Sequence, residues 1–161
     1  MIRAATQEDA KAILNIYSYY VLNSHSTFEL VPPSIESMKE KVSKSNYPWF
    51  VMEENDSIVG YAYATQWKPR EAYSKTVETS VYLDHKTQGK GYGTLLYQRL
   101  IDELTTSGFH ALLAGISLPN DASIRLHEKL GFEKVGQLKE VGFKFDRWID
   151  VGYWELQLDL E

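Results

Sequence analysis

A glycine-rich segment between a strand pattern and a helix pattern constrains the fold of this chain more than any other feature. Residues 85–94 read His-Lys-Thr-Gln-Gly-Lys-Gly-Tyr-Gly-Thr, with three glycines within five positions. Glycine tolerates positive φ and lets backbone N–H groups come close to a ligand, and the amides at the start of a helix favour phosphate. The segment therefore predicts a strand, an anion-binding loop and a helix in succession; a plain turn with a tight helix start is the alternative.

The segments on either side of this loop carry strand and helix periodicity. Residues 75–83 alternate with period two, which predicts a strand. Residues 91–106 predict a helix, and we expect its inner face to carry Leu95, Leu96, Leu100 and Leu104. A further strand is expected over 111–116, so residues 75–116 predict one right-handed strand–helix–strand crossover.

The rest of the chain supplies three more helices and several strands. Thr6 and Asp9 mark the start of an amphipathic helix, and further helices are expected over 34–45 and 120–130. Strands are expected over 49–52 and 58–65, residues 24–33 form an irregular loop, and the last strand spans 153–160. The order β-α-α-β-β-β-α-β-α-β-β predicts one α/β (α+β) domain over residues 1–161, with a mixed, largely antiparallel sheet and helices on both faces.

Composition excludes several classes of function. The chain has 161 residues, no cysteine and a formal net charge of −5. The lack of cysteine rules out disulfides, a thiol nucleophile and thiolate metal sites, and the four histidines lack ligand spacing, so no metal is expected. The negative charge argues against a nucleic-acid partner. Because no membrane span or signal pattern is present, we expect no membrane association and a cytoplasmic location.

Two common phosphate-binding motifs do not fit the glycine-rich segment. A P-loop needs Gly-Lys followed by Ser or Thr after four spacer residues, and the chain has no such run. A dinucleotide fingerprint needs a third glycine where Thr94 stands, and an acidic residue near 111–117, where there is none.

The segment instead resembles the pyrophosphate loop of the GNAT superfamily of N-acetyltransferases. The matching pattern is Gln88-x-x-Gly91-x-Gly93, and residues 120–132 are similar to that superfamily's Asn-containing helix followed by Leu-Gly-Phe. A narrower resemblance covers almost the whole chain: segments 26–29, 70–73, 76–82 and 142–151 are similar to the phosphinothricin and methionine sulfoximine acetyltransferase family.

The narrower resemblance implies a GNAT-like fold, acetyl-CoA as cosubstrate, and acetyl transfer to the primary α-amine of a small amino-acid analogue by direct attack. It also implies a homodimer. Acceptors of other kinds remain open, namely a protein N-terminus, a polyamine or an aminoglycoside. A non-catalytic acyl-CoA-binding sensor is the alternative from another functional class.

The same resemblance assigns the residues that would bind acetyl-CoA. The backbone of the strand end would contact the pantetheine and acetyl carbonyl, and one of its N–H groups could meet the oxyanion. The loop would hold the pyrophosphate, and an asparagine would bind the cofactor by a hydrogen bond. In this chain these positions are Val81, Tyr82 and Leu83 for the strand, Gln88, Gly89, Lys90, Gly91, Tyr92 and Gly93 for the loop, and Asn120.

Two residues are candidates for proton transfer. Glu78 lies within a strand, where carboxylates are depleted, and its face leads to the loop, so it could take the proton of the amine. The alternative is a solvated surface carboxylate. His127 stands where many superfamily members have the tyrosine that protonates the leaving thiolate. It could serve as that acid, although a histidine packed within its helix is the alternative.

Substrate selection is expected in the loops. The candidates are Phe28, Glu29, Arg70, Tyr73 and Lys75. An arginine could grip the carboxylate of an amino acid with two hydrogen bonds, although Arg70 could also be an exposed turn charge. Phe145 and Trp148 lie near a predicted hairpin, where aromatic side chains belong to the core or a dimer interface. They could also cover the substrate pocket of a partner subunit.

Overall fold

The computed structural model describes residues 1–159 of the chain. Its helices are α1 (Ala10–Asn23), α2 (Ile35–Ser43), α3 (Tyr92–Thr106) and α4 (Asp121–Lys129), with single 3₁₀ turns at Gln7–Asp9 and Glu71–Tyr73. Its strands are β1 (Ile2–Ala4), β2 (Trp49–Glu54), β3 (Ser57–Gln66), β4 (Thr76–Leu83), β5 (Ala111–Ser117), β6 (Glu133–Lys144) and β7 (Arg147–Gln157). This order of helices and strands confirms the predicted one.

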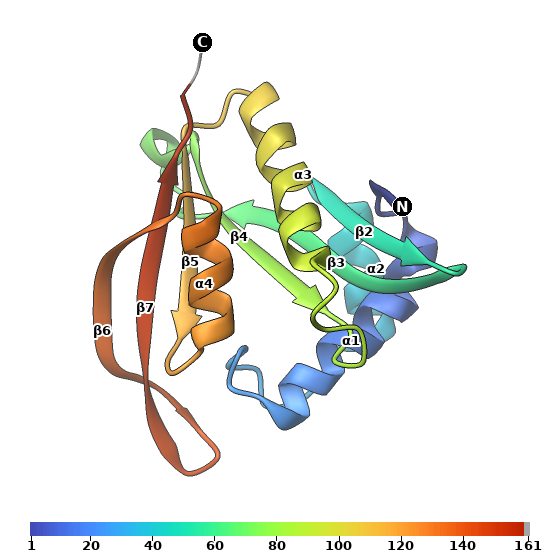
Figure 1. Cartoon of the computed structure of the whole chain (residues 1–161), viewed down its shortest axis with the longest axis horizontal. Coiled ribbons are helices and arrows are strands. Elements are labelled where there is room, and N and C mark those ends of the chain that lie inside the picture. Colours follow the sequence, from blue (N-terminus) through green and yellow to red (C-terminus); the bar gives the residue numbers. More distant parts are fainter. Residues whose placement is uncertain (160–161) are drawn as a thin grey trace.

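The strands form one seven-stranded sheet in the order β1-β2-β3-β4-β5-β7-β6. Every neighbouring pair is antiparallel except β4 and β5, which are parallel and joined through α3. The largely antiparallel mixed sheet is therefore as predicted. Figure 1 shows β4 and β5 starting side by side and then separating toward their C-terminal ends.

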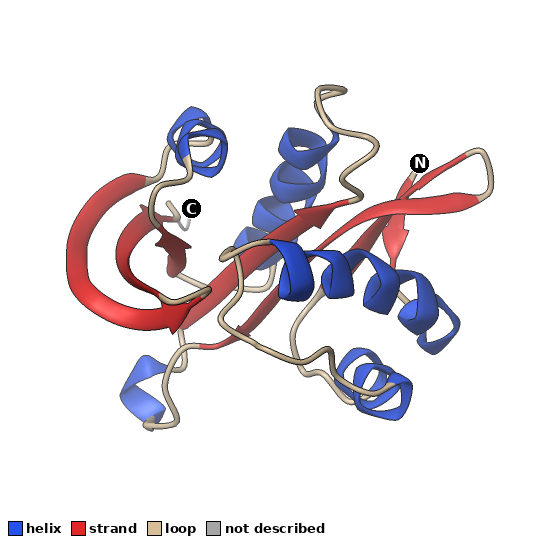
Figure 2. Cartoon of the chain, turned by 90° about the horizontal axis from the view of Figure 1, so that it is seen from below, coloured by secondary structure: helices blue, strands red, loops and turns tan. Residues whose placement is uncertain are grey.

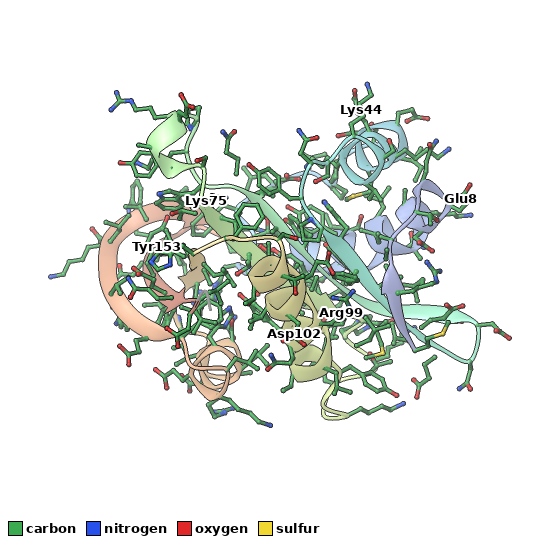
Figure 3. All side chains as sticks on the ribbon, turned by 90° about the horizontal axis from the view of Figure 1, so that it is seen from above. Glu8, Lys44, Lys75, Arg99, Asp102 and Tyr153 are labelled. Carbon is green, nitrogen blue, oxygen red and sulfur yellow. The ribbon has the colours of Figure 1, made fainter. Side chains whose placement is uncertain are left out.

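The helices cover both faces of the sheet (Figure 2). One face packs on α3 and carries the larger core, in which Leu100, Leu104 and Leu112 are fully buried. The other face packs on α1 and α2 around Ile13 and Val51. Figure 3 shows the two layers from above, with Lys44 at the end of α2 on one side and Asp102 of α3 on the other.

Local differences from the sequence predictions have simple physical causes. Leu95 was expected on the inner face of α3 and is 54 % exposed. Tyr97 and Ile101 are buried instead, because the helical period brings residues 93, 96–97, 100–101 and 104 to one side. Residues after Thr6 begin as a 3₁₀ turn rather than an α-helix. The last strand ends at Gln157, and Leu160, its predicted end, lies outside the described residues.

Strands β6 and β7 form a long hairpin that curves away from the rest of the sheet (Figure 2). We call residues 133–157 the β6–β7 arm. Within it, residues 139–141 of β6 face Asp150 alone, because the register shifts between Leu138 and Gly142. Glu140 sits there at φ 52° and its N–H donates to Asp150 Oδ1 at 2.9 Å. A bulge of this kind bends a strand and re-aims its side chains.

Candidate active site

The centre of the site is the point where β4 and β5 part. Their parallel pairing covers only residues 76–78 and 111–113, whereas β4 continues to Leu83 and β5 to Ser117. Beyond the fork, the edges of β4 and β5 that face each other no longer pair. Such edges present backbone N–H and C=O groups to a ligand.

A groove of about 520 Å³ lies between the separated ends of β4 and β5. Its lining crosses the sheet, because Thr79 and His127 reach it from the α3 side whereas Tyr20 and Tyr82 reach it from the α1 side. Most of the residues predicted to bind the cofactor line it together: Val81, Tyr82, Leu83, Gln88, Gly89, Gly91, Gly93 and Asn120. A long, thin ligand placed here would reach both faces of the sheet.

The glycine-rich loop has the backbone that its sequence predicts. Gly89 and Gly91 have φ values of 85° and 77°, and an added Cβ at either position would meet nothing within 4 Å. Positive φ, rather than crowding, therefore requires glycine at both positions. Gly91 caps the 15-residue α3, whose first turn has no acidic side chain. The free amides and dipole of this helix start suit a pyrophosphate.

Lys90 and Tyr92 do not line the groove, although they belong to the same loop. Lys90 Nζ lies 3.1 Å from Glu54 Oε2, and the Tyr92 hydroxyl donates to the same carboxylate. The Tyr92 hydroxyl, and then Lys90, hold the pKa of Glu54 below its usual range. Two loop side chains thus face β2 instead of the fork.

Asn120 and His127 belong to α4, at the groove's edge. Asn120 caps the helix, with Oδ1 accepting from the Ser123 N–H at 3.2 Å. A hydrogen bond to a cofactor would therefore come from its Nδ2. His127 Nδ1 lies 2.6 Å from the Ser123 carbonyl oxygen, which fixes Nδ1 as the donor. Burial lowers the pKa of His127, so the neutral ring carries no proton on Nε2.

Glu78 stands at the fork on the face that α1 and α2 cover. Its carboxylate lies beside Gly115, where an added Cβ would be 3.7 Å from Oε1 and close to the Tyr153 ring. The side chain is half-buried, and burial raises the pKa of Glu78. Thr65 is its register partner on β3, so both side chains leave the sheet on one face. A carboxylate of this kind is a better proton acceptor near neutral pH than an exposed one.

A second cavity, of about 630 Å³, opens on the same face between β3 and α2. Tyr63 and Thr65 line its floor, and Glu29 lines its rim. The Glu29 carboxylate lies 4.0 Å from Lys41 Nζ. Strand β3 lines this cavity and strand β4 lines the groove. The two strands pair, and Glu78 stands opposite Thr65 of the cavity, although it lines neither space itself.

The five predicted substrate residues fall into two groups. Phe28 and Glu29 lie in the loop after α1, and the Phe28 ring packs on Gly142 of the β6–β7 arm. Arg70 precedes the 3₁₀ turn before β4, Tyr73 ends it, and both are exposed. Lys75, labelled in Figure 3, precedes β4, and its Nζ would lie 3.8 Å from a Cβ added to Gly108. Of the five, Glu29 alone lines a cavity, and the substrate role of all five stays a prediction.

The structure adds polar residues that sequence reasoning missed. Thr79 is buried on the face of β4 that packs on α3, and its hydroxyl is hydrogen-bonded to the Tyr97 hydroxyl. It also lines the groove. A polar residue on an otherwise apolar strand face was the available signal. His25 and Ser117 meet 92 residues apart, with 2.9 Å between Nδ1 and Oγ. Nothing in the local sequence of either residue indicated that contact.

Phe145 and Trp148 are 52 % and 64 % exposed, so neither belongs to the core of the single chain. Within residues 1–159, no helix is long and apolar enough to cross a membrane. The same residues contain no group of three or more His, Cys, Asp or Glu placed to hold a metal ion.

Comparison with known proteins agrees with this geometry. A family model described as an acetyltransferase (GNAT) domain matches residues 2–152. The chain is 38 % identical to a phosphinothricin N-acetyltransferase of Streptomyces viridochromogenes, covering 99 % of this chain and 88 % of the relative. It is 40 % identical to an L-methionine sulfoximine/L-methionine sulfone acetyltransferase of Salmonella typhimurium, covering 98 % and 94 %.

A solved structure from Salmonella typhimurium is similar over the whole chain. It is a putative acetyltransferase with its cofactor acetyl-CoA, it is 39 % identical, and it superposes with a TM-score of 0.97 over 100 % of this chain and 95 % of that one. The forked strands, the glycine-rich loop and these similarities lead to one conclusion: the chain belongs to the GNAT family of N-acetyltransferases.

Proposed function

We propose that the protein transfers an acetyl group from acetyl-CoA to the primary α-amine of a small, amino-acid-like acceptor. The observation that carries this proposal is Glu78, a half-buried carboxylate at the fork between β4 and β5, with a raised pKa. Glu78 lines neither space itself, but its neighbours line both: Thr79 and Gly115 line the groove, which suits the cofactor, and Thr65 lines the cavity over Tyr63, which suits an acceptor.

The proposed chemistry is direct transfer within a ternary complex. Acetyl-CoA supplies an activated thioester. Glu78 takes a proton from the ammonium group of the acceptor, directly or through water, and thereby frees the nitrogen lone pair. A C–N bond then forms as the C–S bond breaks; the nitrogen gives up its second proton through water, and CoA leaves as a thiolate that takes up this proton. The oxyanion is met by a backbone N–H at Val81 or Tyr82, and the absence of cysteine disfavours an acetyl-enzyme.

His127 fits a packing role better than the role of acid for the leaving thiolate. Its only ring proton at neutral pH is the one donated to the Ser123 carbonyl. The ring also packs edge-on against Tyr97 and Phe132, with centroids 5.0 and 5.2 Å away. We propose that His127 closes the groove wall as a neutral side chain.

The proposed acceptor class follows the names of two relatives, and the proposed assembly follows an exposed apolar surface. Two relatives that match the whole chain are named for phosphinothricin and methionine sulfoximine. The β6–β7 arm exposes six large apolar side chains, each 49–64 % exposed, which fits a homodimer: Val135, Leu138, Val141, Phe143, Phe145 and Trp148. We further propose a cytoplasmic enzyme.

The test is thiol release from acetyl-CoA with methionine sulfoximine, phosphinothricin, spermidine or a short peptide as acceptor. We expect turnover with the first two, and a loss of about 10²- to 10⁴-fold in kcat for Glu78→Gln, the usual range for a general base. Glu71→Gln, which changes an exposed carboxylate near the start of β4, serves as the matched control.

The outcomes separate the alternatives. Turnover only with spermidine or the peptide would keep the transferase and overturn the amino-acid acceptor. Tight acetyl-CoA binding without turnover on any amine would instead favour a sensor. An unchanged kcat in Glu78→Gln would remove the base role.

A further inference from the structure

Lys144, in the β6–β7 arm, is a buried lysine that the proposed chemistry does not use. Its side chain is 3 % exposed, and Nζ donates to the carbonyl oxygens of Thr27 and Glu29 at 2.9 and 3.0 Å. These partners precede it by 117 and 115 residues. Burying an ammonium group is costly unless it finds acceptors, so the two carbonyls fix where this side chain can lie.

The strand geometry aims Lys144 at the loop after α1. The bulge at 139–141 precedes it, and the register resumes with Gly142 opposite Ile149. Gly142 and Lys144 then share one face, because side chains alternate along a strand. Both meet the same loop, since the Phe28 ring occupies the space above Gly142.

The loop itself has no helix or strand over residues 24–34. Its N-terminal end is held locally, with the Ser26 N–H donating to Ser24 Oγ at 2.9 Å and the Tyr82 hydroxyl reaching the Ser26 carbonyl. Farther along, the Tyr17 hydroxyl meets Thr27 Oγ1 at 2.7 Å. Lys144 holds the backbone of the part of the loop that reaches Glu29, whereas Lys41 lies 4.0 Å from the Glu29 carboxylate.

The position of the Lys144 contact matters because the two ends of the loop line different cavities. Ser26 lines the groove at the fork, whereas Glu29 lines the cavity over Tyr63 and Thr65. Loss of Lys144 would leave Ser26 held by Ser24 and Tyr82. It would free the carbonyls of Thr27 and Glu29 and leave Thr27 held by Tyr17, so the loop should loosen most at Glu29, which lines the proposed acceptor cavity.

We propose that Lys144 is a positioning residue for the acceptor: by holding the Thr27 and Glu29 carbonyls, it sets the rim of the cavity over Tyr63 and Thr65, from which the amine reaches Glu78. This inference rests on the proposed function, because it takes the cavity beside Glu78 as the acceptor site. It assigns Lys144 no contact with the acetyl group and no proton transfer.

The test compares Lys144→Met, which keeps the length of the side chain and removes its donors, with Lys144→Arg, which keeps donors. The exposed Lys139→Met on the same strand is the control. Kinetics with methionine sulfoximine give KM for each substrate, and hydrogen–deuterium exchange follows residues 25–30. We expect Lys144→Met to raise KM for the amine about ten- to a hundredfold, the range for losing charge-assisted hydrogen bonds.

In that variant KM for acetyl-CoA should stay within about twofold, exchange at 27–30 should quicken, and Lys144→Arg should recover part of the loss. An equal rise in both KM values, or no rise in either, would overturn the proposal. If Lys144→Met does not fold, Gly142→Ala tests the same rim, because its Cβ would lie 2.3 Å from the Phe28 ring. It should raise the amine KM alone.

The exchange measurement keeps the two proposals apart. If the wild-type protein acetylates none of the amines, the proposed function fails. Unchanged exchange at 27–30 in Lys144→Met would then overturn the positioning role as well, and faster exchange there, absent from Lys139→Met, would support it.

Discussion

The two halves of the site are built in different ways. The cofactor half is lined mainly by two short, continuous segments, the strand–loop–helix around residues 76–94 and the strand–helix around 111–127, with Tyr20 and Ser26 added from the α1 side. The acceptor half is assembled by side chains from remote segments, such as Lys144 on the Thr27 carbonyl and Lys41 beside Glu29. The first half therefore depends on local conformation and the second on long-range packing. Substitutions should affect them separately.

The sharpest test of the cofactor half is Gly91→Ala. Gly91 has φ 77°, and a left-handed conformation costs an L-residue roughly 1–2 kcal/mol. If the loop must keep this shape to bind, Kd for acetyl-CoA should rise about five- to thirtyfold, with KM for the amine unchanged. Calorimetric titration with acetyl-CoA measures the first and initial rates the second.

Gly136→Ala is the matched control, because an added Cβ there meets nothing within 4 Å and its φ is not positive. A rise in the amine KM in Gly91→Ala would break the comparison, since it would show that the two halves move together.

The same contrast explains how much the sequence could predict. Glycine spacing and strand–helix periodicity indicated the cofactor half, and eight of the ten predicted cofactor residues line the groove. The side chains of Lys90 and Tyr92 face Glu54, which lies 36 and 38 residues earlier, and no local pattern predicts that contact. Burial of one charge by two distant carbonyls, as at Lys144, leaves no periodic trace in the sequence. The positive charge of Arg70 and Lys75 predicts binding of an acidic group, but charge alone does not indicate toward which cavity a side chain points.

A smaller effect separates local from long-range contacts by pH, because each kind holds one histidine with a lowered pKa. Burial lowers the pKa of His127, which is hydrogen-bonded to Ser123 within α4, and of His25, which meets Ser117, a groove residue 92 positions later. As pH falls, each histidine binds a proton in the unfolded state before it does so in the folded state. The contribution of the two histidines to folding stability is therefore full above pH about 6.5 and is lost as pH falls below it. His127 is the more deeply buried and should account for the larger share.

Urea unfolding at several pH values between 5 and 7 measures this slope. His127→Gln should flatten it more than His25→Gln. Glu78 has a raised pKa and acts with the opposite sign, but it is the same in all three proteins. A wild-type stability that does not fall with pH in this window, or a slope unchanged in both variants, would contradict the assignment.

The smallest expected effect concerns Glu54, a distant side chain that contacts two residues of the glycine-rich segment. Glu54 neutralises Lys90 with oxygens 3.1 and 3.2 Å from Nζ, while it also accepts from Tyr92. Glu54→Gln keeps an acceptor for Tyr92 and removes the negative charge, so Lys90 becomes available to the pyrophosphate. Because the pair is exposed and screened by solvent, Kd for acetyl-CoA should fall only about two- to threefold at low salt.

Salt distinguishes this charge effect from a change in loop shape. At about 1 M salt the Debye length is near 3 Å, so the gain should vanish, and Glu36→Gln on α2 should show no gain at any salt concentration. Weaker binding in Glu54→Gln, independent of salt, would mean that Glu54 holds the loop in its binding conformation. The cofactor half would then depend on long-range side-chain contacts as the acceptor half does, and the distinction between them would be one of degree.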